Sequence, residues 1–579
     1  PERCCDVCRA HAFTDDAFLR LSPIWHAPHA RVSAMPSLWS TIAIAWRTTA
    51  AVATSPDLTI SIGHLVGTTP STFLAHGWEP WTAISSFVHF DNPAVVKAVS
   101  HLKGQTVRFG GISADWLAYT VNSTVTPGCS FPIAWDGQAC PFSTGAFDLL
   151  LDFLSTANIR LLFDLNELSG RNCSQPGPKP WQPAEWCGDE PAAWDLKPMR
   201  ALLQHVRDRG LEGVVGFELG NELFAPPHLS PATAAADVTR LAALFREVWT
   251  GDHPPRLYAT GTNDCENRNN SDTMAALATM GIDGGFSFHS YPGDMRGWWD
   301  KSDLPSFLLN SSWLRSVTLA QTAPCLAAWN DGPRAKGLFT AVTEAAAISG
   351  GDFGPGDPTT ASFVHGFFSI AQLGQYALSG VAMVARWGLP GLLALHGAAK
   401  WKASDVASDL FLYVLYNATV GHGVLRVTGD DASDVLVYAH CAAADGFGAN
   451  GSVTLLVANP SNRTVALRVS GLPSRPRLEY VLTAPNGDLA AHTPVLNGDT
   501  DSPLALGADG SLPPMLARFC GDDDCTEALS LPPRSQSFFV LLGARSAACS
   551  EEDAMVESVS TSAAVAAAVP RAASAPMDF

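Results

Sequence analysis

Short apolar runs alternate with amphipathic segments along the chain from about Leu58 to Leu395. The apolar runs predict strands, which cover Thr106–Phe109, Arg160–Leu165, Val214–Leu219, Arg256–Thr260, Phe286–Ser290, Leu338–Thr343 and Gly380–Arg386. A helical period between them predicts helices over Phe147–Ala157, Pro198–Arg209, Ala234–Thr250 and Thr360–Leu378. Because strands that alternate with helices at this spacing form parallel sheets, the pattern predicts an α/β fold, a (β/α)8 TIM barrel. No GxGxxG or Walker motif opens any of these units, which disfavours a doubly wound nucleotide-binding fold.

The pattern changes after about Lys402, where short strand-like runs are separated by turn residues and no helical period is found. These runs are Gly423–Val427, Asp434–Tyr438, Ser452–Val457, Thr464–Val469 and Ser537–Leu541. They predict an accessory C-terminal antiparallel β-sandwich. The expected division is an N-terminal extension or degraded signal region over 1–56, the barrel over 57–401, the sandwich over 402–549 and a disordered tail over 550–579.

The segment Leu38–Trp46 resembles a degraded signal peptide that begins near Met35, although a short buried helix is an equal alternative. The chain contains 36 basic and 55 acidic residues, which gives a net charge of −19. That balance argues against a nucleic-acid binder, which needs a basic surface. No uninterrupted apolar run of about 18 residues occurs, so we expect no membrane span.

The 13 cysteines include local pairs that suggest disulfides, namely Cys129/Cys140, Cys173/Cys187 and Cys520/Cys525. Sequons for N-glycosylation start at Asn122, Asn172, Asn269, Asn310, Asn417, Asn450 and Asn462. Together they favour a secreted, extracellular or lysosomal/vacuolar protein. The single CxxC among Cys4, Cys5 and Cys8 has no partner motif, so no metal site is expected there.

Two predicted barrel strands end in a glutamate. Gly216–Glu222 reads Gly-Phe-Glu-Leu-Gly-Asn-Glu, and Leu338–Glu344 reads Leu-Phe-Thr-Ala-Val-Thr-Glu. The carboxyl ends of barrel strands meet at one face, so Glu222 and Glu344 can face each other there. A carboxyl pair of this kind is what glycoside hydrolysis requires. On spacing alone, two unrelated surface acids are an equal alternative.

The ordered motifs resemble glycoside hydrolase family 79, the heparanases and plant heparanase-like β-glucuronidases. The resemblance spans roughly Leu58–Cys549. Its motifs are Val107–Asp115, Leu162–Leu168, Phe217–Glu222, Phe288–Tyr291, Tyr438–Cys441 and Ala547–Cys549. It implies a disulfide between Cys441 and Cys549.

By the same resemblance Glu222 is the general acid/base and Glu344 the nucleophile of a retaining mechanism. Asn221 would bond the sugar 2-hydroxyl, and Arg108 would keep the nucleophile ionised, with a structural ion pair as the alternative. The other implied substrate contacts are His289, Tyr291, Arg296, Gly350 and Gly351.

Several positions depart from the family's pattern. Ser349 replaces the tyrosine before the Gly-Gly pair, Ala394 a later tyrosine, Ile112 a threonine or serine, and His228 a lysine. An early aspartate has no clear equivalent around Gly63–His64. The uronate-binding set is therefore only partly kept, and the acidic chain suits heparan sulfate poorly.

The sequence thus predicts a retaining glycoside hydrolase of β-linked, glucuronide-type glycans or glycosides. Two alternatives stay open: a carbohydrate-binding pseudoenzyme with a degraded subsite, and a retaining β-glycosidase for a neutral sugar. No metal or organic cofactor is implied, since two carboxyl groups suffice. The expected partner is a carbohydrate substrate, and a single-chain monomer is expected.

Overall fold

The computed structural model shows a closed barrel and a separate sheet domain. It describes residues 58–125, 140–168, 194–222, 229–251, 254–262, 265, 270–293, 304–330, 338–348, 360–395, 400–429, 433–443, 451–521, 525–542 and 544–550. The N-terminal extension, the tail beyond its first residue, and the Cys173/Cys187 pair lie outside these residues.

Eight parallel strands close the barrel in the order β10-β11-β2-β3-β6-β7-β8-β9. They are β2 (Leu74–Trp78), β3 (Thr106–Phe109), β6 (Arg160–Leu165), β7 (Val214–Leu219), β8 (Arg256–Thr262), β9 (Gly284–Ser290), β10 (Phe339–Ala345) and β11 (Met383–Arg386). A short parallel pair, β4 (Leu117–Thr120) and β5 (Cys140–Ser143), lies beside it in the chain. The predicted TIM barrel is confirmed, and seven of its strands coincide with predicted runs.

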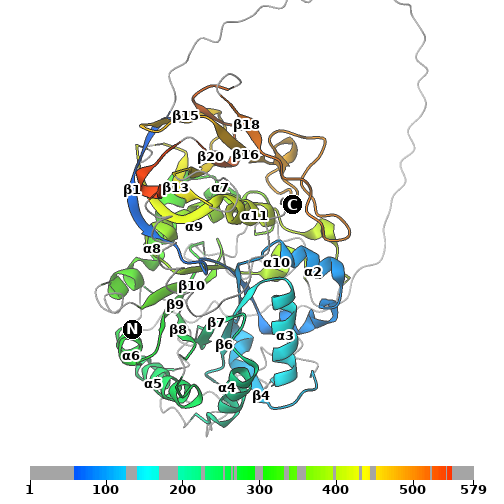
Figure 1. The fold of residues 1–579 in the computed structure, drawn as a ribbon, viewed down its shortest axis with the longest axis vertical. Coiled ribbons are helices and arrows are strands. Elements are labelled where there is room, and N and C mark those ends of the chain that lie inside the picture. The colour runs from blue at the N-terminus through cyan, green and yellow to red at the C-terminus, as the bar shows by residue number, and fades with distance from the viewer. Residues whose placement is uncertain are drawn as a thin grey trace, which may run out of the picture. The chain divides into compact units, whose positions relative to one another are not determined.

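Helices follow the barrel strands, and Figure 1 shows α3 to α6 around the outside of β6 to β9. The barrel helices are α1 (Pro80–Ser85), α2 (Pro93–Ser100), α3 (Thr144–Thr156), α4 (Lys197–Arg209), α5 (Pro231–Val248), α6 (Ser271–Thr279), α7 (Leu304–Leu308), α8 (Ser311–Asn330), α9 (His365–Leu378) and α10 (Leu389–Leu393). Local sequence sets their ends: Ser143 and Ser230 cap α3 and α5 through their side chains, and α4 ends at Gly210.

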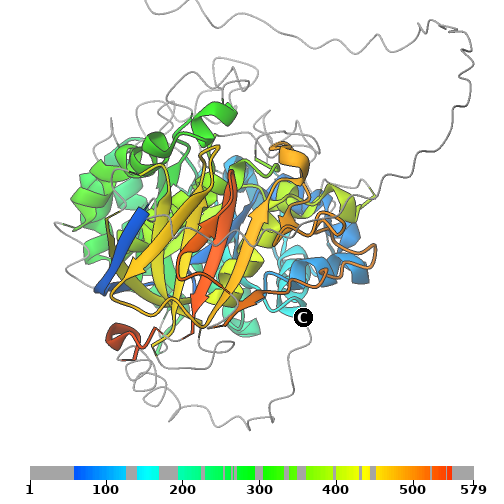
Figure 2. The same ribbon diagram turned by 90° about the horizontal axis from the view of Figure 1, so that it is seen from above.

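The sheet domain is one ten-stranded sheet, ordered β17-β16-β20-β14-β13-β12-β1-β15-β19 with β18 beside β16. Its strands are β1 (Leu58–Thr68), β12 (Val420–Thr428), β13 (Leu436–Ala442), β14 (Val453–Asn459), β15 (Val465–Ser470), β16 (Arg477–Thr483), β17 (Val495–Leu496), β18 (Arg518–Cys520), β19 (Leu529–Leu531) and β20 (Ser535–Leu541). Figure 2 shows the central strands side by side, from β1 in blue to β16 in orange. All pairs are antiparallel except β1 with β15.

The central strands are buried on both faces. Along β14, Leu455 and Val457 belong to a core inside the sheet domain, whereas Leu456 and Ala458 join the barrel core. Helix α9 packs against β14 and β20 and is buried all round except at its end, as expected for a helix between two layers.

The structure differs from the expected division in two respects. The barrel does not begin at 57, because β1 pairs with β12 and β15 in the sheet domain, where Leu58 and Ile60 enter its core. The region after 401 is not purely β either, since α11 (Asp409–Thr419) is a buried helix against α9, β12 and β20.

The described residues hold disulfides Cys265–Cys325, Cys441–Cys549 and Cys520–Cys525. Cys140 is also disulfide-bonded, and its predicted partner Cys129 lies outside the described residues. The Cys265–Cys325 bond was not predicted, because 60 residues separate its cysteines in the sequence. None of the described helices combines the length and apolarity needed to cross a bilayer.

Candidate active site

Arg108, on β3, is fully buried inside the barrel and contacts four acceptors. Its Nε lies 2.5 Å from Glu218 Oε2, and its Nη1 lies 2.6 Å from Glu344 Oε1. Its Nη2 lies 3.2 Å from Asp164 Oδ2 and 2.9 Å from Asn221 Oδ1. One planar guanidinium thereby fixes side chains from β6, β7 and β10 in a single arrangement.

Three carboxyl groups surround this one cation, so the cluster would carry excess negative charge if all were ionised. Burial, with the nearby Glu218 and Asp115, raises the pKa of Asp164 well above its usual range. Asp164 stands opposite Glu218 in the β6–β7 register. Arg108, 3.2 Å from Asp164, acts in the opposite direction on the pKa of Asp164, so this carboxyl group is the one most affected by burial in the cluster.

Glu344 lies at the end of β10, with its carboxyl group almost fully buried. Arg108 bonds its Oε1, and the Tyr291 hydroxyl donates to its Oε2 at 2.6 Å. Burial raises the pKa of Glu344, while His289, Arg108 and the Tyr291 hydrogen bond act in the opposite direction. Both oxygens are held in place, which orients the carboxyl group.

Glu222 follows β7 in a left-handed backbone conformation, with φ of 52°. Such a conformation is uncommon at a residue other than glycine. Its Oε1 lies 2.7 Å from His289 Nδ1, which is 3.5 Å from Glu344 Oε2. Burial lowers the pKa of His289 to about 4, so its ring is neutral at pH 7. The ligand atoms of Glu222, His289 and Glu344 all lie within 4.8 Å of one another.

Asp115 connects the segments that follow β6 and β7. Its carboxylate accepts hydrogen bonds from the backbone N–H of Asn221 at 3.0 Å and of Glu167 at 2.8 Å. Asn221 is thereby oriented with its Oδ1 on Arg108, and its buried Nδ2 has no partner among the described residues. This amide is a free donor beside the two glutamates.

Glu79 is a site residue that the sequence analysis missed. It directly follows β2, the true first barrel strand, whereas the acid was sought around Gly63–His64 in a sheet-domain strand. Its Oε1 accepts from the Ser113 N–H and hydroxyl, at 2.7 and 2.5 Å. Burial raises its pKa to about 8, and Glu344 adds to this. The sequence did carry a signal for Glu79, because an acid stands at the end of β2 as it does after β7 and at the end of β10.

The Gly-Gly pair after β3 makes room for these side chains. A Cβ atom on Gly110 would lie 2.6 Å from Arg108 Nε, and one on Gly111 would lie 1.9 Å from Glu79 Oε2. Gly111 also has φ of 136°, which favours glycine.

We predict that Glu79 makes folding stability fall as pH rises. The folded state holds its proton up to about pH 8, whereas an unfolded glutamate loses it near 4.5. The contribution of Glu79 to folding stability is therefore complete below pH 4.5 and is lost between pH 4.5 and 8. Glu79→Gln should remove this loss, which is on the order of a few kcal/mol. Thermal unfolding from pH 4.5 to 8.5 tests this, with exposed Glu212→Gln as control. Equal slopes in wild type and Glu79→Gln would contradict it.

Only some of the other predicted positions lie within the described residues. Arg296, Gly350, Gly351, Ser349 and His228 lie outside the described residues. Ala394 is buried after α10, and Ile112 is half-exposed in the 3₁₀ helix Ile112–Trp116. Trp387, which sequence reasoning did not single out as a site residue, packs with Tyr291 and Ala346 at the end of β11.

Glu222, His289 and Glu344 are also close enough to ligate a metal ion. However, Arg108 brings a positive charge onto Glu344 Oε1, and Tyr291 already bonds Oε2. A cation would have to compete with both, so the arrangement fits acid/base chemistry better than metal binding.

Known proteins resemble this chain in sequence. Residues 70–291 match the model of glycosyl hydrolase family 79, N-terminal domain. The chain is 25% identical to heparanase-like protein 1 of Arabidopsis thaliana, over 81% of this chain and 88% of that relative. It is 26% identical to baicalin-β-D-glucuronidase of Scutellaria baicalensis, over 82% and 88%.

Among solved structures, a 4-O-α-L-rhamnosyl-β-D-glucuronidase from Fusarium oxysporum superposes with a TM-score of 0.58 at 14% identity. The match covers 84% of this chain and all of that one. At this identity the likeness concerns the fold, and it supports the same barrel-plus-sheet architecture. Together with the family match over residues 70–291, which include Arg108, Glu222 and His289, these findings show that the chain is similar to glycosyl hydrolase family 79.

Proposed function

We propose that this glycosyl hydrolase cleaves β-glucuronides with retention of configuration, using Glu344 as nucleophile and Glu222 as general acid/base. The observation that carries the proposal is the pairing of the two carboxyl groups, whose oxygens lie within 4.8 Å of each other. Retaining enzymes hold the pair about 5–5.5 Å apart, whereas inverting enzymes leave room for a water molecule.

In the first step, a Glu344 oxygen forms a bond to the anomeric carbon as the glycosidic C–O bond breaks. Glu222 gives its proton to the leaving oxygen, so the aglycone departs as an alcohol. Arg108 keeps Glu344 ionised and Tyr291 orients it. The unpartnered Nδ2 of Asn221 supports a hydrogen bond from this amide to a sugar hydroxyl as positive charge develops on the ring.

In the second step, Glu222, now ionised, takes a proton from water, which attacks the anomeric carbon and releases Glu344. The neutral His289 ring can serve both steps. Its Nδ1 donates to ionised Glu222 in one tautomer and accepts from protonated Glu222 in the other. No cofactor is needed for either step.

The choice of a glucuronide rests on the relatives. Both the Scutellaria relative and the Fusarium structure are named as β-D-glucuronidases. The net charge of −19 favours small glucuronides or sparsely charged glycans over a highly sulfated chain.

A panel of aryl β-D-glycosides tests the substrate class. We expect kcat/KM to be highest for the glucuronide among glucuronide, glucoside, xyloside and galactoside. A neutral glycoside cleaved at least tenfold faster would replace the proposal with the neutral-sugar alternative. No turnover of any of the four would favour the pseudoenzyme, although the paired carboxyl groups argue for turnover.

We also propose that the protein matures in the secretory pathway and acts as a monomer outside the cell or in a lysosome or vacuole. The disulfides and the seven sequons support the compartment. Digestion with a deglycosylating enzyme, followed by light scattering, tests glycosylation and oligomeric state together.

A further inference from the structure

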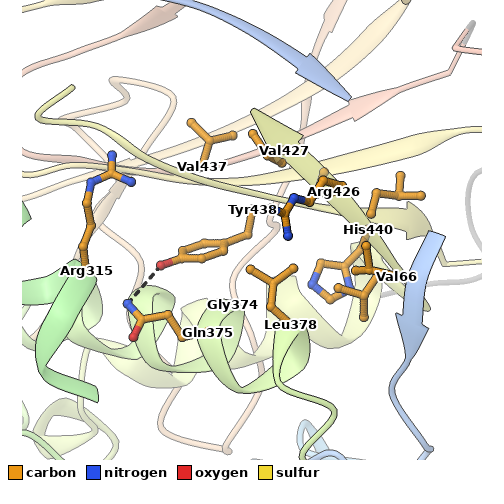
Figure 3. A pocket seen from close by; sticks show the side chains of 13 residues that line it. Val66, Arg315, Gly374, Gln375, Leu378, Arg426, Val427, Val437, Tyr438 and His440 are labelled. Carbon is orange, nitrogen blue, oxygen red and sulfur yellow. Dashed lines mark hydrogen bonds between the residues drawn. The ribbon is translucent and has the colours of Figure 1, made fainter. Parts of the chain in front are cut away.

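A cavity of about 350 Å³ lies where the sheet domain meets helices α8 and α9. Figure 3 shows the side chains that line it, with α9 on one side and strands β12 and β13 on the other. Its size is at the lower end of the range for small-molecule sites. It is not part of the catalytic cluster, because its described lining residues include none of Arg108, Glu222, His289, Tyr291 and Glu344.

The cavity lies away from the catalytic end of the barrel. Gln375 and Leu378 belong to the last turn of α9, a few residues before β11 begins at Met383. Helix α9 therefore brings them toward the amino-terminal ends of the barrel strands. Glu344, in contrast, lies at the carboxyl end of β10.

Two buried polar side chains in this cavity have unused hydrogen-bonding atoms. Gln375 donates from Nε2 to the Leu314 carbonyl and the Tyr438 hydroxyl, but its Oε1 has no partner among the described residues. His440 is 1% exposed. The Gly421 carbonyl is near its ring, yet neither ring nitrogen makes a hydrogen bond of good geometry. Burial lowers the pKa of His440 to about 4, so the ring is neutral and offers one donor and one acceptor.

The charge of the cavity is opposite to that of the chain. Arg315 and Arg426 line it, and none of its described lining residues is acidic, although the net charge is −19. Arg315 also donates to the Val435 carbonyl. The exposed Arg426 makes no ion pair or hydrogen bond with any described residue, and Figure 3 shows it extending from β12 toward α9.

The remaining walls are apolar. The Tyr438 ring packs directly on α9 at Gly374, where a Cβ atom would lie 2.2 Å from the ring. Leu378 and Val66 are 44% and 38% exposed at this site. The residues that line this one cavity therefore combine a guanidinium, an amide, an imidazole and an apolar surface.

We propose that this cavity is an accessory binding site for a sugar acid of hexuronate size. The carboxylate would bond Arg426, a hydroxyl would donate to Gln375 Oε1, and His440 would bond a second hydroxyl. The apolar face of the ring would lie against Leu378 and Tyr438. A bare inorganic anion such as sulfate offers no donor to Gln375 Oε1, and a neutral sugar offers no charged partner to Arg426. The choice of a sugar acid over other hydroxy acids rests on the proposed function.

Calorimetric titration of the full-length chain with D-glucuronate tests the proposal. The wild type, Arg426→Gln and the matched control Arg463→Gln are compared, because both changes remove one exposed positive charge. Any binding at the catalytic site is common to all three, so the difference reports this cavity. We expect Arg426→Gln to weaken the accessory binding about tenfold or more, the effect of losing a charge-assisted bond. Arg463→Gln should bind as the wild type does.

Leu378→Trp is a second variant that should fill the cavity and also abolish this binding. D-Glucose and sulfate should each bind at least tenfold more weakly than glucuronate. Equal isotherms for wild type and Arg426→Gln would overturn the proposal, as would equal binding of sulfate or glucose. The kcat on an aryl glucuronide should be unchanged in Arg426→Gln. If no glycoside is cleaved but the difference in binding persists, only the proposed function fails.

Discussion

Glu344→Gln is expected to lower kcat on any aryl β-glucuronide by a factor on the order of 10⁴ or more. An amide cannot attack the anomeric carbon, so the covalent step is lost whatever the leaving group. The fold should survive, because the amide can still accept from Arg108 at the Oε1 position and meet the Tyr291 hydroxyl at the other. Initial rates and a thermal melt measure both effects.

Glu222→Gln is the informative comparison, since it removes an acid/base rather than the nucleophile. Its rate should fall by roughly 10²–10⁴ for poor leaving groups, which need a proton, and much less in the first step for nitrophenol. If Glu344→Gln showed the same dependence on leaving group, or kept a near-normal rate, the assignment of roles would be wrong.

Arg108→Gln is expected to affect both stability and chemistry. Loss of the guanidinium leaves Glu218 and Glu344 buried without their cation, which should cost about 3–5 kcal/mol of unfolding free energy. Arg108 lowers the pKa of Glu344, so its removal should raise that pKa. Because the nucleophile acts when ionised, the acidic limb of the kcat/KM profile should move to higher pH. Denaturant unfolding and a pH–rate profile measure the two effects.

Arg477→Gln provides the matched control. Arg477 is equally buried and pairs with Glu479 at 2.7 Å, but it lies in the sheet domain. It should destabilise the protein without shifting the pH profile. A profile unchanged in Arg108→Gln, once folding is accounted for, would reduce Arg108 to a structural ion pair.

Strands rich in β-branched and aromatic residues were predictable from the sequence. β7 and β10 are examples, and each leads directly to an acid of the site. β2 escaped prediction because it reads Leu-Ala-His-Gly-Trp, with no β-branched residue. Tertiary contacts explain this composition: Gly77 leaves space for Trp387, and His76 bonds Gln105 at 2.6 Å. β16 was also not predicted, because its sequence contains the charged residues of the buried Arg477–Glu479 pair.

The site residues were likewise predictable only where the sequence itself carries a motif, and not where their role depends on tertiary contacts. Glu222, Glu344, His289, Tyr291 and Arg108 were all named from sequence, and the structure brings them together. Glu79 was missed because the early acid was sought around Gly63–His64, which lie in β1, a strand that pairs within the sheet domain. Asp164 and Glu218 carry no sequence signal beyond their strands. Their importance comes from sharing Arg108, which is a property of the closed barrel.

The most direct test of the two-glutamate account is to trap the covalent intermediate. The wild-type protein would be incubated with a 2-deoxy-2-fluoro-β-D-glucuronosyl fluoride, digested, and analysed by peptide mass spectrometry. The account predicts one sugar attached to the peptide that contains Glu344, and none on that peptide in Glu344→Gln. An adduct on Glu222, or turnover of an aryl glucuronide with inverted anomeric configuration and no adduct, would contradict it.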